Sequence, residues 1–158
     1  MRSLVAASLI TLAVGCMPSE AELPAPDFDD FRATIYPLLL RDCGLSRCHG
    51  DADRFFAVWG PGRQRLAPEF DEPLDPPTED EVWLSYQRTR AALTHDRAPG
   101  GQLISKQLLD APLLRKPLEG HDHAGQDRWG HNLWTREDPR WRMLVVWAAG
   151  VPLEEIGS

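Results

Sequence analysis

The sequence predicts an all-α domain in which three to four short helices are joined by long loops. Three stretches carry apolar residues at helical spacing, and neither strand-like alternation nor an internal repeat is seen. The 14 prolines and 12 glycines among 158 residues predict long irregular connections. A chain of this length suits one compact domain, and its hydrophobic content of 42% excludes a wholly disordered protein.

The first residues indicate export. Arg2 precedes an apolar run over residues 4–14, which is too short to span a bilayer as a mature helix. Small residues before Cys16 resemble the lipobox of bacterial lipoproteins. This resemblance implies that residues 1–15 are a signal peptide and that Cys16 carries a lipid. It also implies that Met17 sorts the protein to the outer membrane of the cell envelope, facing the periplasm. The alternative is a plain signal peptide that is cut elsewhere.

Residues 16–27 are proline-rich and acidic, and they predict a flexible tether between the lipid anchor at Cys16 and the folded domain. The chain has 17 Lys and Arg against 24 Asp and Glu, a formal net charge of -7. Nucleic acid is bound chiefly by cationic side chains, so this balance excludes it as the main partner. The acidic residues over 69–81 are expected to form a solvated face.

The folded domain is predicted over residues 28–153, with residues 154–158 as a C-terminal tail. Asp27 is the expected cap of a first helix that runs to about residue 41. Pro37 predicts a kink between residues 33 and 37, because proline lacks the backbone donor that a helix uses. The apolar face of this helix comprises Phe28, Phe31, Ile35, Leu38 and Leu39.

Two further helices have clear start signals. Thr78 and Glu81 form a capping box, which predicts a helix to about residue 94. Asp138 and Pro139 predict the start of the last helix, which runs to Ala149. Residues 102–109 predict one or two helical turns, whereas residues 61–77 and 112–135 are predicted loops. The residues expected to face inward are Val82, Tyr86 and Leu93 in the middle helix and Trp141, Leu144, Val145 and Ala148 in the last, which Gly150 terminates.

Cys43, Cys48 and His49 form the one sharp chemical motif, with four residues between the two cysteines. In an exported chain such a pair can close as a disulfide beside an exposed histidine. The same residues and a second histidine would satisfy the tetrahedral preference of zinc. The third possibility is a c-type haem attachment site, whose common form has two residues between the cysteines.

The wider sequence resembles bacterial lipoproteins with a planctomycete-type cytochrome c-like domain. The resemblance covers residues 28–153. It includes the helix before Cys43, the Lys116-Pro117 pair, the segment from His123 to Gly125, and the last helix. It implies one covalent haem c, with thioether bonds to Cys43 and Cys48 and with His49 as an iron ligand. It also implies that the first helix crosses the last one near its end.

The second iron ligand is expected in the loop before the last helix. Met17 and Met143 are poorly placed, whereas His121, His123 and His131 lie in this loop. We expect His123 to be the ligand, because the glycines at 120 and 125 let the backbone approach a flat ring. Arg115 and Lys116 are candidate partners of the haem carboxylates. Aromatic residues that either wall the haem or belong to the core are Phe55, Phe56, Trp59, Trp129, Trp134 and Trp141.

These expectations describe a lipid-anchored electron carrier that passes single electrons to an unknown redox partner and does not itself transform a substrate. Two alternatives remain at this stage. The domain could be a haem-free structural or interaction module with a Cys43–Cys48 disulfide, or a peroxidase-like enzyme that has an open iron site and no distal histidine. Common motifs of other enzyme classes, such as the phosphate-binding loop, are not found.

Overall fold

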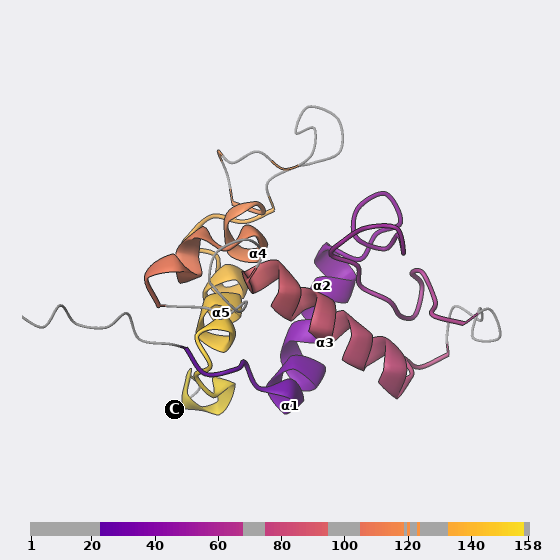
Figure 1. Cartoon of the computed structure of the whole chain (residues 1–158), viewed down its shortest axis with the longest axis horizontal. Coiled ribbons are helices and arrows are strands. Elements are labelled where there is room, and N and C mark those ends of the chain that lie inside the picture. Colours follow the sequence, from indigo (N-terminus) through magenta and orange to yellow (C-terminus); the bar gives the residue numbers. More distant parts are fainter. Residues whose placement is uncertain are drawn as a thin grey trace, which may run out of the picture.

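The computed structural model describes residues 23–67, 75–94, 105–118, 120, 123 and 133–156. This part of the chain is helical, which confirms the all-α prediction (Figure 1). Its only extended pairing is an isolated bridge between Leu118 and Trp134. The predicted signal peptide, Cys16, His121 and His131 lie outside the described residues. Within the described ranges, we find no helix long and apolar enough to cross a membrane.

The first helical run consists of α1 (Phe28–Asp30), a π-helical turn η1 (Phe31–Ile35) and α2 (Tyr36–Asp42). The Asp27 side chain accepts the Asp30 N–H at 2.8 Å, so this residue caps the run as predicted. In the π turn, the Tyr36 N–H donates to the Phe31 carbonyl five residues back. The turn lies directly before Pro37, whose ring and missing donor disturb a regular helix at this point.

The middle helix α3 (Glu79–Thr94) begins with the predicted capping box. The Glu81 N–H donates to Thr78 Oγ1 at 3.2 Å, and the Thr78 N–H donates to Glu81 Oε2 at 3.0 Å. Our expectation that all acidic residues over 69–81 are solvated is wrong for Glu81, which is 0% exposed. Its carboxylate is buried because the Arg65 guanidinium pairs with both of its oxygens, at 2.8 and 3.0 Å.

Helical turns also occupy the region between α3 and the last helix. The 3-10 helix η4 (Ser105–Asp110) corresponds to the turns predicted over 102–109. The helix α4 (Pro112–Arg115) lies in a segment that we predicted to be loop throughout. Its proline occupies the first turn, where no backbone donor is needed. The predicted loop over 112–135 is therefore interrupted at its start.

The last helix is α5 (Pro139–Ala148), and the 3-10 helix η5 (Leu153–Ile156) follows it. The Asp138 side chain caps α5 by accepting the Arg140 N–H at 2.8 Å. Gly150 has a φ of +72° and ends the helix as predicted. Its N–H donates to Trp147 O at 2.9 Å, and the next N–H donates to Val146 O at 3.2 Å, which is the Schellman arrangement.

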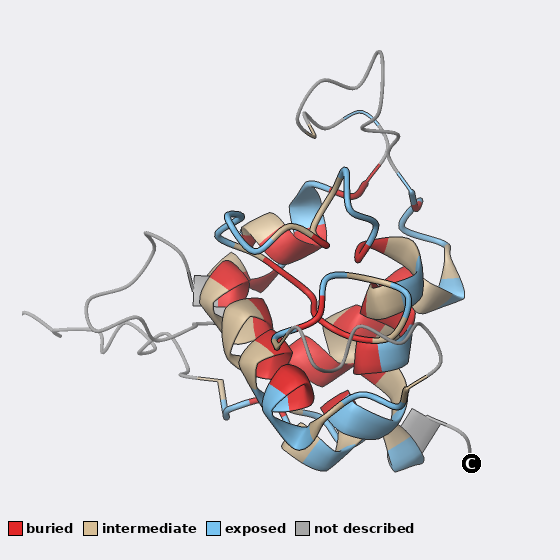
Figure 2. Cartoon of the chain, turned by 90° about the vertical axis from the view of Figure 1, so that its right-hand side faces the viewer, coloured by how far each residue is buried: buried red, intermediate tan, exposed pale blue. Residues whose placement is uncertain are grey.

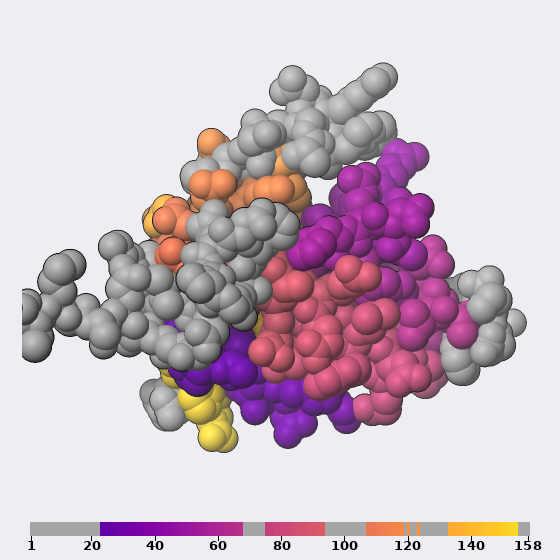
Figure 3. Space-filling model, viewed as in Figure 1, coloured from indigo at the N-terminus to yellow at the C-terminus, as the bar shows by residue number. Residues whose placement is uncertain are grey.

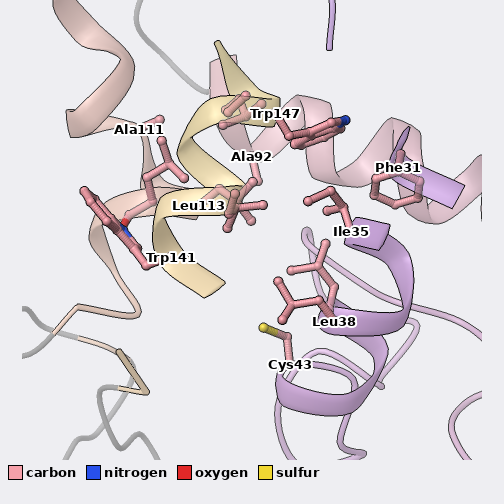
Figure 4. Packing of buried hydrophobic residues seen from close by; sticks show 14 of the residues in the cluster. Phe31, Ile35, Leu38, Cys43, Ala92, Ala111, Leu113, Trp141 and Trp147 are labelled. Carbon is pink, nitrogen blue, oxygen red and sulfur yellow. The ribbon is translucent and has the colours of Figure 1, made fainter. Parts of the chain in front are cut away.

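The helices meet at an aromatic cluster, formed by Phe31 of η1, Tyr86 of α3 and Trp147 of α5. Figure 4 shows Phe31 and Trp147 in this cluster. The ring centre of Phe31 lies 5.3 Å from that of Tyr86 and 5.5 Å from that of Trp147. Buried residues line the inner sides of these helices (Figure 2). Burial of rings of this size supplies much of the hydrophobic stabilisation of a small domain.

The last residues of the predicted tether pack against this core. The Tyr86 hydroxyl donates to Pro26 O at 2.6 Å, and Trp147 Nε1 donates to Asp27 O at 2.8 Å. Leu23 packs against the core cluster, and Pro26 is buried. Residues 23–27 are therefore part of the folded unit. The chain after α5 is also tied back, since the Leu153 N–H donates to Asp30 Oδ2 at 2.9 Å.

Candidate functional site

The segment from Cys43 to Gly50 forms a compact loop at the end of α2. The Cys43 and Gly44 N–H groups both donate to Leu39 O, at 2.8 and 2.9 Å, and so terminate the helix. The His49 N–H donates to Cys43 O at 3.0 Å, which closes the loop. A Cβ atom on Gly50 would lie 2.1 Å from Gly44 O, so this position accepts only glycine. Gly44 is also crowded, since a Cβ atom there would lie 2.7 Å from Leu40 O.

Both cysteines of the motif are free thiols in the structure. Cys43 is buried in the core cluster, and its sulfur points away from α2 toward the side on which Leu113 and Trp141 lie (Figure 4). Burial raises the pKa of the Cys43 thiol to about 12, and the neighbouring Asp42 and Cys48 act in the same direction. Cys43 therefore stays protonated at neutral pH. Cys48 is half-buried.

His49 is held by one hydrogen bond from its ring. Its Nδ1 lies 2.9 Å from Phe56 O, and because a carbonyl can only accept, Nδ1 carries the proton. Nε2 is then the nitrogen with a free lone pair. Burial, together with the charges of His123, Arg54 and Lys116, lowers the pKa of His49 to about 4, although the hydrogen bond to the Phe56 carbonyl acts to raise it. The imidazole is thus neutral at pH 7, the form that binds metals.

His123, which the sequence predicts to be the second ligand, lies beside His49. The centres of the two rings are 6.0 Å apart, and the ring planes differ by 17°. The two rings are therefore stacked, and the fold brings together two imidazoles from segments that are far apart in the sequence. Met143 instead packs against the core from α5.

Positive charges flank this pair of histidines. Lys116, one of the two cations proposed from the sequence, is close enough to influence the pKa of His49, and so is Arg54, which we had not singled out. Arg115, the other cation proposed from the sequence, is exposed.

The aromatic residues near the motif have different roles. Phe56 packs on His49, with ring centres 4.5 Å apart, whereas Phe55 is 51% exposed. Trp59, Trp134 and Trp141 are buried and contribute to the core, and Trp129 lies outside the described residues. Of the predicted aromatic wall, only Phe56 therefore has a ring contact with a candidate ligand among the residues described.

The four residues selected from the sequence lie in one region. Cys48 is close enough to Cys43 to raise the pKa of its thiol, His49 follows Cys48 directly, and His123 adjoins His49. Within the described part of the chain, no group of three or more His, Cys, Asp or Glu has the geometry of a metal site. Comparison with protein families, with curated proteins and with solved structures found no match for this chain.

Proposed function

We infer that this protein is an exported, lipid-anchored electron carrier, a c-type cytochrome-like protein. Cys43 and Cys48 would hold one haem covalently, and His49 and His123 would be its iron ligands. The observation that carries the proposal is the pairing of His49 with His123, at 6.0 Å between ring centres, next to two unbridged cysteines. These side chains come from segments that are far apart in the sequence, and each was selected before any spatial information.

The state of His49 supports a role as a metal ligand. Imidazoles that bind metals usually donate their other N–H to a backbone carbonyl or a carboxylate, which fixes the ring and strengthens the ligand. The His49 Nδ1 donates to Phe56 O and leaves Nε2 for the metal. His49 is thus held at Nδ1, and the binding of one metal ion by both rings would require a rotation of the His123 side chain.

Burial at Cys43 disfavours the charged thiolate form when no group is bound to the sulfur. A thioether sulfur is uncharged, so it suits the apolar surroundings of Cys43 in the core cluster. The disulfide reading is the alternative, and it predicts a haem-free interaction module.

The helix arrangement also supports the resemblance to cytochrome c-like domains. In such domains the helix that precedes the haem motif crosses the last helix. Here Phe31 of η1 contacts Trp147 near the end of α5, and the same helical run leads into Cys43 (Figure 1).

Each site residue has a defined task in this proposal. Cys43 and Cys48 hold the cofactor in a small domain, His49 and His123 fix its orientation, and Lys116 and Arg54 offer charges to its carboxylates. Haem iron supplies the one-electron change when it is bound. Ligation by two histidines favours a lower reduction potential than ligation by histidine and methionine.

The decisive experiment is the visible spectrum and mass of the mature protein, produced together with a cytochrome c assembly machinery. We expect a Soret band that stays with the protein after acid-acetone extraction, and a mass increased by one haem. Loss of the band on extraction, with a mass two hydrogens below that of the dithiol, would identify the disulfide module and overturn the proposal.

Two variants distinguish the axial ligands. His123→Ala should convert a low-spin spectrum into a high-spin one, because one iron position loses its ligand. His131→Ala is the matched control from the same predicted loop, and it should leave the spectrum unchanged. An unchanged low-spin spectrum in His123→Ala would reject His123 as the ligand. A high-spin spectrum in the unaltered protein would favour the open, peroxidase-like site.

A further inference from the structure

Residues 56–59, which we call the strap, lie directly against His49. The Phe56 carbonyl accepts the Nδ1–H of the ring at 2.9 Å. The Val58 N–H donates to the His49 carbonyl at 2.7 Å. The strap is therefore hydrogen-bonded to both the side chain and the backbone of His49. A displacement of the strap would strain or break these bonds and so change the orientation of the imidazole.

Two buried hydroxyls fix the far end of the strap at Trp59. The Trp59 N–H donates to Ser85 Oγ at 3.1 Å, and the Trp59 carbonyl accepts the Tyr36 hydroxyl at 2.7 Å. Ser85 is 0% exposed and Tyr36 is 3% exposed, so water does not compete for these bonds. Gly60 follows, and a Cβ atom there would lie 2.2 Å from the Tyr36 hydroxyl oxygen. The absence of a side chain at Gly60 therefore allows the Tyr36 hydroxyl to reach the Trp59 carbonyl.

The two hydroxyls come from different helices. Tyr36 is the first residue after the π turn, on the helix α2 that leads into Cys43, whereas Ser85 lies on α3. On one face of the molecule, α3 lies beside the segment that follows the motif (Figure 3). The strap is therefore held between α2 and α3.

We propose that Tyr36 and Ser85 are positioning residues for His49, acting through the backbone of the strap on the orientation of its imidazole. The consequence for electron transfer rests on the proposed function, because it requires His49 to bind iron. A strap held in place keeps the Phe56 carbonyl on Nδ1, which strengthens the imidazole as a ligand and stabilises oxidised iron. Loosening the strap should therefore move the reduction potential to a more positive value.

The chain offers a matched control for the Tyr36 hydroxyl. Tyr86 is also buried, and its hydroxyl also donates to a backbone carbonyl, that of Pro26, at 2.6 Å. Tyr36→Phe and Tyr86→Phe remove the same atom and the same kind of bond. The first change affects the strap, and the second affects the segment before α1.

The first measurement uses haem-free protein and hydrogen exchange of the Val58 amide, with the Leu144 amide of α5 as the reference for global opening. We expect Tyr36→Phe to speed exchange at Val58 about tenfold relative to Leu144, the factor that corresponds to one lost hydrogen bond. Ser85→Ala should have the same local effect, and Tyr86→Phe should have none. This result does not depend on haem, so it tests the strap even if the proposed function is wrong.

The second measurement uses haem-loaded protein. Tyr36→Phe and Ser85→Ala should shift the reduction potential upward while the spectrum remains low-spin, and Tyr86→Phe should leave the potential unchanged. Equal potentials in all three variants would overturn the positioning role. So would equal exchange at Val58 in Tyr36→Phe and Tyr86→Phe, because the two hydroxyls would then serve stability alone.

Discussion

At the crossing of η1, α3 and α5, the rings of Phe31, Tyr86 and Trp147 pack against one another, with centres 5.3 to 6.4 Å apart. The segment from Cys43 to Leu66 is held differently. Its backbone is bound by buried polar groups from the neighbouring helices, namely the hydroxyls of Tyr36 and Ser85 and the Glu81 carboxylate. One region is therefore stabilised mainly by apolar burial, whereas in the other directed hydrogen bonds to the backbone add to the burial of residues such as Val58 and Trp59.

The difference corresponds to what each region has to do. Hydrophobic packing is not directional, so it stabilises a helix crossing without fixing any single atom. Hydrogen bonds require short distances and near-linear geometry, so they fix atoms in place. A segment that must present one nitrogen of His49 in a fixed direction needs the second kind of support.

The largest effect should follow from removing Trp147 from the crossing. Trp147→Ala deletes a ring that is 0% exposed and removes the shorter of the two hydrogen bonds that Asp27 O accepts, leaving the one from the Phe31 N–H. We expect a loss of about 4 kcal/mol in the free energy of unfolding, measured by urea denaturation. Trp83→Ala is the control on α3, where the ring is 49% exposed, and it should cost less than about 1 kcal/mol. Similar losses in both variants would contradict the assignment of the crossing as the apolar core.

The crossing was largely predictable from the sequence. Helical periodicity identified Val82, Tyr86 and Leu93, which are all buried, because a helix places every third or fourth residue on one side. The caps at Thr78 and Asp138 were also predictable, since each depends on neighbours within three residues. Trp147 was not on the expected inner face of α5, because the buried side is wider than the stripe we chose.

The polar support of the site was not predictable. The partner of Glu81 is Arg65, which lies 16 residues away across a loop, and no local pattern connects the two. The acceptor for His49 is a backbone carbonyl, that of Phe56, and every residue has one. Sequence patterns identify the side chains that can do chemistry. The bonds that orient those side chains depend on how distant segments pack.

The second prediction concerns the buried hydrogen bonds of Glu81. This carboxylate accepts from Arg65 and from the Leu66 N–H, and Glu81→Gln leaves the buried Arg65 guanidinium without its counter-charge. Loss of one partner of a buried ion pair is costly, so we expect the free energy of unfolding to fall by about 3 kcal/mol, as measured by urea denaturation. Arg32 and Glu79 form an exposed ion pair, and Glu79→Gln is the control, with an expected loss of less than about 1 kcal/mol.

The same pair predicts a pH dependence. Burial acts to raise the pKa of Glu81, but hydrogen bonds from Arg65, Thr78 and Leu66 outweigh it and lower the pKa below the ordinary value of 4.5. The ionised carboxylate therefore stabilises the fold above pH 4.5, and this contribution is lost as the pH falls through the folded-state pKa. The stability difference between the unaltered protein and Glu81→Gln should shrink over this range. A constant difference would show that Glu81 acts through packing alone.

The smallest effect compares two buried tryptophans that differ in one bond. Trp141 Nε1 donates to Leu114 O at 2.9 Å, whereas Trp134 Nε1 is buried and has no hydrogen-bond partner in the described structure. Substitution by phenylalanine removes the same volume at both positions, but only Trp141→Phe leaves a buried acceptor unpaired. We therefore expect Trp141→Phe to cost about 1–3 kcal/mol more than Trp134→Phe in thermal or urea unfolding. Because both substitutions remove the same volume, the difference between their losses in the free energy of unfolding reports the hydrogen bond of Trp141 alone. Equal losses would mean that hydrogen bonds from buried tryptophans add little to the stability of the apolar core.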